Sequence, residues 1–398
     1  MSLNRTRDTL GLYAAIGCLS YLLAGMGAIL PELRADRGLS RLEAALYPSA
    51  FAVGLVVIGV AGHRLARLLG RQAVPAALIA LIGGIAVLAV VPSRPVSGIG
   101  ALIYGLGGAA LVQLVPVRLR AAHGDQAVVA IGEANALGSA ASVLAPVIIG
   151  VCLAGPGWQV GLVALPAVAA VALLAGPLRA GHTMPRDPAP VEKGPMPRGF
   201  LGWWVDLVLA VSAEFCMLLW AVDYFKSAGG LSSSAATFGA AGFTLGMAAG
   251  RTLVGPATRL VAVPVRLLAA AATLALLGFA LFWSAAGAAL MVAGLFSTGL
   301  GVALLYPVTL AQALATWPGQ PDRAAARCAL ASGVAVGAAP LLLGAWADAV
   351  GLRVAYLLAP ATLVAFIAHC LIRLADRPGA AAGRAARTTE PRTVPRPR

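Results

Sequence analysis

A carboxylate, Glu214, stands near the middle of an apolar stretch at residues 200–222. Glu214 lies between AVSA and FCMLLW, and the stretch is long enough to cross a bilayer as a helix. An ionised side chain in hydrocarbon costs about 2.5–3.5 kcal/mol on insertion scales, so Glu214 has to be paired, hydrated or neutral. Such a residue indicates a site that carries a proton or binds a cationic substrate group. The alternative is an interhelical hydrogen-bond anchor.

A second acidic residue, Glu133, lies about a turn and a half into the apolar stretch 127–152. It is a candidate for a second proton site. Pairing with Arg118 or Arg120 at a cytoplasmic gate is the alternative, and we rank it slightly higher. The sequence order alone does not decide between the two roles.

Asp206 and Arg251 belong to consecutive apolar stretches that run in opposite directions. Their depths in the membrane match, and buried charges are usually paired. We therefore predict an Asp206–Arg251 ion pair, which is structural or closes a gate.

The composition is that of a protein embedded in a membrane. Of the 398 residues, 60% are hydrophobic and 11% are charged, and the mean hydropathy is +0.88, whereas a soluble domain has about 25% charged residues. We predict an all-α integral membrane protein with twelve membrane-spanning helices, because apolar runs of this length cross a bilayer. The spans are expected at 9–30, 43–62, 74–92, 97–117, 127–152, 159–178, 200–222, 233–255, 265–284, 286–307, 326–347 and 354–374.

The lysines and arginines are distributed unevenly between alternate loops. Most of the 29 fall on the side that holds both termini, and cytoplasmic loops carry such an excess. We therefore predict cytoplasmic N- and C-termini, and the net charge of +14 needs no nucleic-acid partner. The exceptions on the outer side are Arg34, Arg37, Arg41, Arg94, Lys226 and Arg353.

Two short sequence segments of the first half have similar counterparts in the second half, and both pairs are separated by the same number of residues. APVIIG at 145–150 returns as APLLLG at 339–344, and GLGGAAL at 105–111 returns as GLGVALL at 299–305. This indicates two parallel, pseudo-symmetric six-helix halves, one of the repeat architectures of secondary transporters. The predicted divisions are an N-terminal half at 1–178, a cytoplasmic linker at 179–199, a C-terminal half at 200–376 and a disordered basic tail at 377–398.

The whole chain resembles the transporters of the major facilitator superfamily. The spans, the linker and the repeat carry the likeness, together with the loop HRLARLLGRQ at 63–72. In the family this loop reads roughly Gly-x-Leu-Ala-Asp-Arg-x-Gly-Arg-Arg. His63 replaces the first glycine, and Arg67 replaces the aspartate that helps to latch the cytoplasmic side. The matching positions are Leu65, Ala66, Gly70 and Arg71.

The resemblance implies a central cavity lined by the first, fourth, seventh and tenth helices, with Glu214 on the seventh. A mostly apolar site with a few polar groups is typical of small-molecule binding. The residues that we expect to line the cavity are Tyr21, Tyr104, Gln113, Ser297 and Thr298.

No pattern in the sequence indicates an enzyme or a cofactor. The five cysteines have no metal-ligand spacing, and no Walker motif indicates an ATP-driven pump. The glycines inside apolar stretches indicate close helix packing.

We therefore expect a monomeric secondary transporter in a bacterial cytoplasmic membrane. Proton-coupled efflux of a drug-like compound or metabolite is the favoured function, because the cavity looks apolar and the family has many such exporters. One alternative is proton-coupled uptake of a small nutrient or an organic anion. The alternative from another class is a membrane sensor or scaffold that transports nothing.

Overall fold

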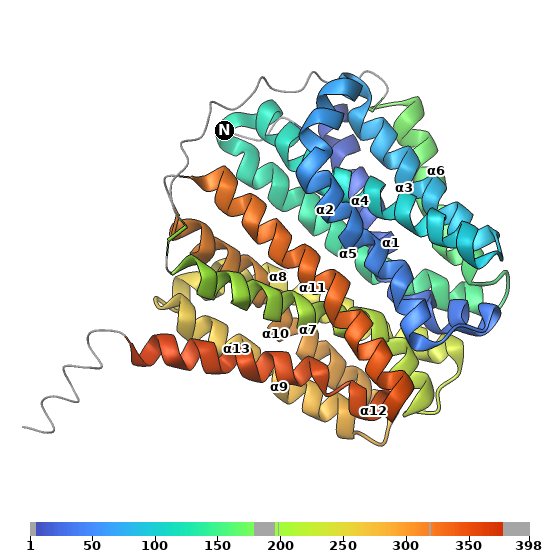
Figure 1. Ribbon diagram of the computed structural model, residues 1–398, viewed down its shortest axis with the longest axis vertical. Coiled ribbons are helices and arrows are strands. Elements are labelled where there is room, and N and C mark those ends of the chain that lie inside the picture. The colour runs from blue at the N-terminus through green and yellow to red at the C-terminus, as the bar shows by residue number, and fades with distance from the viewer. Residues whose placement is uncertain (1–4, 179–195, 198, 318–319, 377–398) are drawn as a thin grey trace, which may run out of the picture.

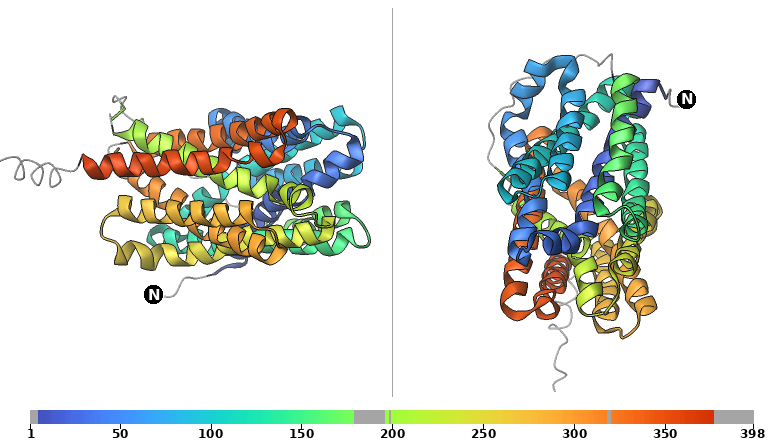
Figure 2. Two further views of the ribbon diagram at one scale, coloured as in Figure 1. Left: turned by 90° about the horizontal axis from the view of Figure 1, so that it is seen from below. Right: turned by 90° about the vertical axis from the view of Figure 1, so that its right-hand side faces the viewer.

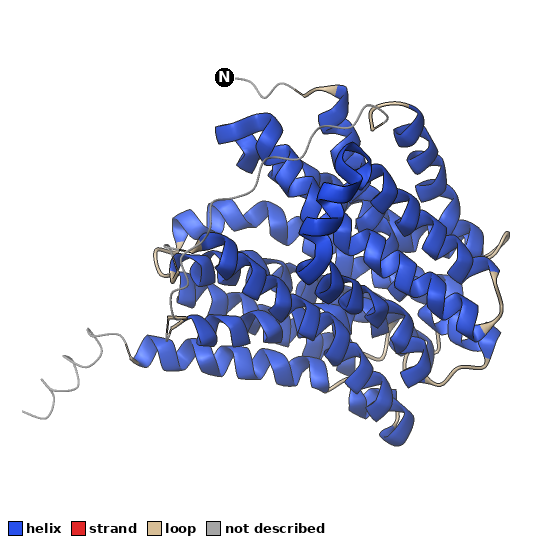
Figure 3. Cartoon of the chain, turned by 45° about the horizontal axis from the view of Figure 1, so that its top comes forward, coloured by secondary structure: helices blue, strands red, loops and turns tan. Residues whose placement is uncertain are grey.

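The computed structural model describes residues 5–178, 196–197, 199–317 and 320–376. The predicted tail and nearly all of the predicted linker lie outside these residues. Within them, all long elements are helices, as Figure 3 shows. The helices are α1 (Arg7–Arg37), α2 (Arg41–Leu69), α3 (Ala73–Val90), α4 (Arg94–His123), α5 (Ala127–Leu153), α6 (Trp158–Ala175), α7 (Phe200–Ser227), α8 (Ser233–Leu260), α9 (Pro264–Ser284), α10 (Ala288–Ala315), α11 (Pro321–Val350), α12 (Leu352–Ala355) and α13 (Leu358–Ala375).

The first two helices extend beyond the predicted apolar spans because their ends are capped. Gly38 ends α1 in the left-handed conformation, with φ of +57°, which a residue without Cβ adopts without strain. The next helix starts immediately, because Ser40 and Glu43 form a capping box. The loop between α1 and α2 is therefore short and well defined.

Eleven segments of the described residues are long and apolar enough to cross a membrane, and the protein is a multi-pass membrane protein. The predicted span 233–255 forms α8, but this helix is not among the eleven. Its many glycine, serine and threonine residues, together with Arg251, lower its hydropathy. A helix that packs against other helices over much of its surface tolerates this composition.

The helices form two sets that pack mainly within themselves. In Figure 1, α1–α6 run from blue to green, and α7–α13 run from yellow-green to red. The main contacts in the first set join α1 to α5 and α4 to both α2 and α3, and in the second they join α10 to both α8 and α9 and α7 to α11. The two sets meet where α2 packs on α11, α5 on α8 and α1 on α7, and Figure 2 shows the bundle from two further sides.

Glycines at corresponding positions of the sequence repeat make corresponding helix contacts. A Cβ atom on Gly84 of α3 would lie 2.3 Å from the backbone nitrogen of Tyr104 on α4. A Cβ atom on Gly278 of α9 would lie 2.5 Å from the backbone nitrogen of Thr298 on α10. Between membrane helices, such small residues allow the backbones to approach closely.

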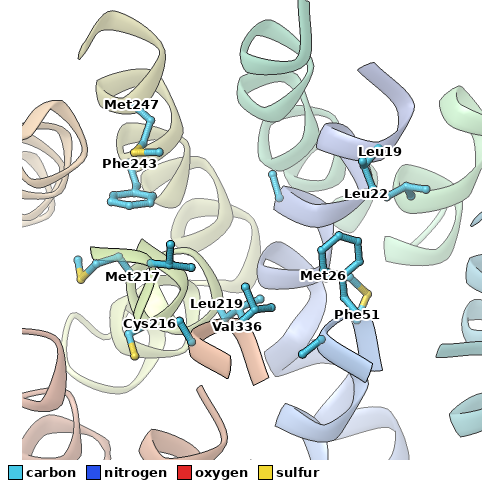
Figure 4. Packing of buried hydrophobic residues seen from close by; sticks show 14 of the residues in the cluster. Leu19, Leu22, Met26, Phe51, Cys216, Met217, Leu219, Phe243, Met247 and Val336 are labelled. Atoms are coloured by element: carbon cyan, nitrogen blue, oxygen red, sulfur yellow. The ribbon is translucent and has the colours of Figure 1, made fainter. Parts of the chain in front are cut away.

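Where the two sets meet, the core is filled by apolar side chains from both. Figure 4 shows Met26 of α1 and Phe51 of α2 on one side, and Met217 of α7 and Phe243 of α8 on the other. All four are nearly inaccessible to solvent. The packing fixes α1, α7 and α8 against one another, and these helices carry most of the site described below.

One end of the molecule is closed by ion pairs between the two sets. Asp223 of α7 is 3% exposed and contacts Arg34 of α1 at 3.2 Å and Arg41 of α2 at 2.9 Å. Lys226 of α7 pairs with Glu32 of α1. We call this end of the molecule, with the α1–α2 and α7–α8 loops, the closed end.

Backbone contacts add to the closed end. The carboxylate of Asp348 on α11 accepts hydrogen bonds from the backbone nitrogens of Arg41 and Leu42, at 3.0 and 2.9 Å. A carboxylate at a helix N-terminus is favourably placed with respect to the helix dipole. Deeper in the molecule, Gly27 of α1 lies so close to the carbonyl of Leu218 on α7 that a Cβ atom there would overlap with it.

Candidate functional site

A cavity lies where the two helix sets meet, between α1, α5, α7 and α8. Its empty volume is about 530 Å³, a figure that includes space open to solvent. Apolar side chains such as Phe215, Phe243 and Met247 form half of the wall. The polar residues of the wall are Ser20, Ser139, Ser142, Glu214, Thr244 and Arg251.

Glu214 and Arg251 form an ion pair inside this cavity. The guanidinium Nη2 of Arg251 lies 3.7 Å from Oε1 of Glu214, and its Nη1 donates a hydrogen bond of 2.9 Å to the hydroxyl of Ser139 on α5. The pair is longer than a hydrogen-bonded ion pair, which spans about 2.7–2.9 Å. The carboxylate in the apolar stretch is therefore compensated by a loosely held partner from the next helix.

The two members of this pair differ in exposure. The side chain of Arg251 is 43% exposed, and that of Glu214 is 18% exposed. Arg251 is also nearer to the end of α8 that is remote from the α7–α8 loop. The more exposed member of the pair therefore lies farther from the closed end.

The predicted Asp206–Arg251 pair is wrong. The side chain of Asp206 is inaccessible, and its partners come from α13: Arg373 at 2.5 Å and His369 at 2.8 Å. The guanidinium of Arg373 also lies 3.6 Å from the ring centre of Trp203 on α7, a cation–π contact. Asp206 on α7 and Arg251 on α8 lie at similar depths along their helices, but the face of α7 that carries Asp206 packs on α13.

The predicted pairing of Glu133 with Arg118 or Arg120 is also wrong. Glu133 binds the guanidinium of Arg5 at 2.6 Å and accepts a hydrogen bond from the hydroxyl of Tyr13 at 3.1 Å. These contacts tie α5 to the beginning of α1 within one helix set. Glu133 does not line the cavity described above.

The five residues expected to line the cavity are not part of its wall. The hydroxyl of Tyr21 donates to the carbonyl of Gly161 on α6 at 2.5 Å, and Tyr104 is inaccessible beside Phe51. The hydroxyls of Ser297 and Thr298 both bond to carbonyls of their own helix.

The last of the five, Gln113, is also outside the cavity. It lies on α4 against Gly59 and Gly62 of α2. The rotations of the helices about their own axes, which the sequence does not give, turn these five residues away from the cavity.

The loop that resembles the family motif is tied to α4. Gly70, with φ of +50°, ends α2, and Arg71 follows in a short turn of 3₁₀-helix. The carbonyls of Gly70 and Arg71 accept hydrogen bonds from the buried guanidinium of Arg118, at 3.2 and 3.3 Å. Arg67 is in the last turn of α2. Arg118, expected at a gate, therefore anchors this loop.

The sequence reasoning missed the hydroxyl groups of α5. Ser139 and Ser142 are three residues apart, so they lie on one face of the helix. Ser142 donates to the carbonyl of Ser20 on α1 at 3.2 Å. The sequence signal for these cavity-lining hydroxyl groups is the presence of two serines, three residues apart, in an apolar stretch. No group of three or more metal-ligating side chains is present in the part of the chain that the structure describes.

The architecture matches solved structures of transporters at low sequence identity. A bacterial homolog of the human lysosomal transporter Spinster, in an inward-facing and occupied conformation, has a TM-score of 0.71 and 14% identity, over 93% of this chain and 97% of that one. The nucleoside transporter NupG, in a mutant form, has a TM-score of 0.74 and 12% identity, over 92% and 99%. FucP, described as a major facilitator superfamily transporter in the outward conformation, has a TM-score of 0.59 and 17% identity, over 92% and 99%.

The chain shares the fold of these solved structures, one of which is described as a major facilitator superfamily transporter. Neither a protein-family model nor a curated protein matches the sequence. At these identities the likeness establishes the architecture, while substrates have to be argued from the site itself.

Proposed function

We propose that the protein is a secondary active transporter that moves a small polar molecule by alternating access. The observation that carries the proposal is the Glu214–Arg251 pair in a cavity between the two helix sets. Charges held at this depth usually belong to a substrate or ion pathway, because hydrocarbon makes them costly. The cavity position also agrees with the midplane site between the repeats of such transporters.

The two helix sets act as the moving bodies in this proposal. They correspond to the halves 1–178 and 200–376, joined by the linker 179–199. With the termini in the cytoplasm, as the arginine distribution favours, the closed end faces outward and the cavity opens inward. We also propose that the protein works as a monomer in a bacterial cytoplasmic membrane.

Glu214 is the proposed coupling group. A carboxylate that faces both solvent and a cationic partner changes its charge state when the partner moves. Its protonation would therefore be linked to the position of Arg251 and to the occupancy of the cavity. Glu133 is not part of this proposal, because Arg5 and Tyr13 hold it outside the cavity.

The arginine in the cavity favours uptake of an organic anion over efflux of a drug-like compound. The sequence predicts efflux because it indicates an apolar cavity, but half of the residues that line the cavity are polar. None of the arginines of α4 lines the cavity, and α8 supplies one in Arg251.

The test is transport by purified protein in liposomes that contain a pH-sensitive dye. Amphipathic cations, neutral drugs, sugars and organic acids are added in turn, and the signal of protein-free liposomes is subtracted. We expect one class to move protons with the wild type and with the control variant Glu133→Gln, and not with Glu214→Gln.

Two results would contradict the proposal. Equal proton movement in the wild type and Glu214→Gln would remove Glu214 from the mechanism. Absence of flux for every class, with folded protein in sealed liposomes, would support the sensor or scaffold function instead.

A further inference from the structure

The two charges of the cavity differ in one chemical respect. A carboxylate can take up a proton in the physiological range once its environment favours the neutral form, whereas an arginine guanidinium stays charged in proteins. The Glu214–Arg251 pair can therefore lose its negative charge and keep its positive charge. The reverse does not occur.

We propose that the cavity binds a small monocarboxylate on Arg251 and Ser139, together with one proton on Glu214. When Glu214 is neutral, Arg251 keeps a positive charge inside the cavity, and an anionic ligand restores neutrality. A positive charge without a partner is unfavourable in a cavity between membrane helices, so the anion and the proton bind cooperatively. This inference rests on the proposed function for its transport consequence, which is symport of the anion with a proton.

A cationic ligand does not fit the same pair. It would have to displace Arg251 from Glu214, and the displaced guanidinium would remain charged beside it. Like charges at close distance repel, and the low dielectric of the site strengthens this repulsion. The asymmetry between the two side chains thus selects anions.

The donors around Arg251 suit a carboxylate. The side chain of Arg251 is almost half-exposed, and its guanidinium uses one nitrogen for the hydrogen bond to Ser139, which leaves further N–H groups for a ligand. Such forks bind carboxylates with two parallel hydrogen bonds. A monoanion is balanced by one neutralised carboxylate, while a phosphate monoester would bring additional negative charge.

The remaining wall of the cavity indicates an apolar body on the ligand. Phe215, Leu218, Phe243 and Met247 are among the larger apolar residues of the wall. A methionine and two aromatic rings adapt well to a flat or branched hydrocarbon group. The class of ligand is therefore an aromatic or branched aliphatic monocarboxylate.

The other titratable groups around α7 leave this coupling to Glu214. Tyr306 on α10 is close enough to interact electrostatically with Glu214, in addition to Arg251 on α8. The cavity wall has hydroxyls from α1 and α5. Six charged groups on the other helices that pack against α7 have partners away from the cavity. These are Glu32 and Arg34 of α1 and Asp348 of α11 at the closed end, Arg353 of α12 on Trp283, and His369 and Arg373 of α13 on Asp206.

The experiment measures binding to the full-length protein in lipid nanodiscs by calorimetry. The probes are benzoate, benzylamine, benzyl alcohol and phenyl phosphate, with empty nanodiscs as the blank. We expect benzoate to bind at least about tenfold more tightly than the other three, because a charged hydrogen bond contributes about 1.5–3 kcal/mol. A pH indicator in weakly buffered solution should report uptake of about one proton per benzoate bound.

Three variants separate the roles of the charges. Glu214→Gln should bind benzoate without proton uptake, since the glutamine imitates the neutral carboxyl group. Arg251→Gln should lose benzoate binding. The double variant Glu214→Gln/Arg251→Gln should lose it as well, and because it leaves no unpaired charge in the cavity, the loss cannot be attributed to an unpaired Glu214. Glu133→Gln is the matched control and should behave as the wild type.

Several outcomes would overturn the inference. These are tighter binding of benzylamine or phenyl phosphate than of benzoate, benzoate binding without proton uptake in the wild type, or binding of none of the probes. The proposed function can fail while this inference holds. If benzoate binds with proton uptake but no flux occurs in liposomes, the monocarboxylate site is confirmed and the transport function is excluded. If another compound class is transported in a way that depends on Glu214, the transport function is supported and the monocarboxylate site is excluded.

Discussion

At the scale of single residues, the acidic groups inside the bundle differ by the partners that neighbouring helices supply. Asp206 is inaccessible and held by two basic side chains of α13. Glu133 is held by Arg5 and Tyr13 near one end. Glu214 alone of these three lines the cavity, and its ion pair is the longest of the three. The loosest of the three pairs is the one suited to change during a reaction cycle.

The Asp206 cluster is expected to be structural. Arg373→Gln removes the arginine that pairs with Asp206 and leaves only His369 beside the carboxylate. Breaking a buried ion pair in this way costs about 3–5 kcal/mol. The variant should therefore unfold at a markedly lower temperature in detergent. The double variant Asp206→Asn/Arg373→Gln should regain most of the loss, and equal instability of the two variants would contradict this role.

At the scale of helices, glycines determine which elements approach each other. Gly84 and Gly278 occupy corresponding positions in the sequence repeat and make corresponding contacts, with α4 and α10. Without a strong hydrophobic driving force inside a membrane, such close backbone packing is a main source of helix association. Equivalent residues of the sequence repeat therefore make equivalent helix contacts, and this supports the proposed division into two halves.

Adjacent glycines on α3 provide a matched test of this packing. A Cβ atom on Gly84 would overlap with α4, whereas one on Gly83 would meet nothing within 4 Å. Gly84→Ala should lower stability by about 1–3 kcal/mol, because the helices have to move apart. Gly83→Ala should be neutral or up to about 1 kcal/mol stabilising, since alanine favours helix. Thermal unfolding of both variants measures the difference, and equal behaviour would refute the steric argument.

At the scale of the whole molecule, the closed end holds the two helix sets together. Asp223 is the centre of this contact, because arginines from α1 and α2 both bind it. Cytoplasmic access to the cavity, in the proposed orientation, requires that this end stay closed. The strength of these ion pairs therefore contributes to the equilibrium between the two transport conformations.

Removal of the Asp223 charge should shift that equilibrium. In Asp223→Asn, the loss of two charge-assisted contacts should change the ratio of conformations by more than about tenfold. Spin labels on cysteines at Gly155 and Gly287, in a background without the five native cysteines, should then report a larger separation. Both positions are exposed and have open space around them.

The control for this shift is Glu43→Gln at the same end. Glu43 forms an exposed ion pair with Arg94 inside one helix set, at 3.6 Å, and glutamine preserves the capping box of α2. This variant should leave the label separation unchanged. An equal shift in both variants would show that general charge loss, and not the contact between the sets, controls the conformation.

The sequence by itself determined the class of molecule, the helices and the presence of a costly carboxylate. Apolar run length and composition are local properties, and a bilayer imposes one solution on them, the helix. For this reason all twelve predicted spans correspond to helices, although α8 is less apolar than the others. The position of Glu214 near the middle of a span was visible in the same way.

Only the tertiary structure decided which side chains meet. Depth along a helix follows from residue number, but a contact also depends on which helices are neighbours and on how each is rotated about its axis. Asp206 and Arg251 matched in depth, yet α7 turns Asp206 to α13 and Glu214 to α8. The arginine that gives the cavity its chemistry was therefore placed by helix packing, which no local pattern encodes.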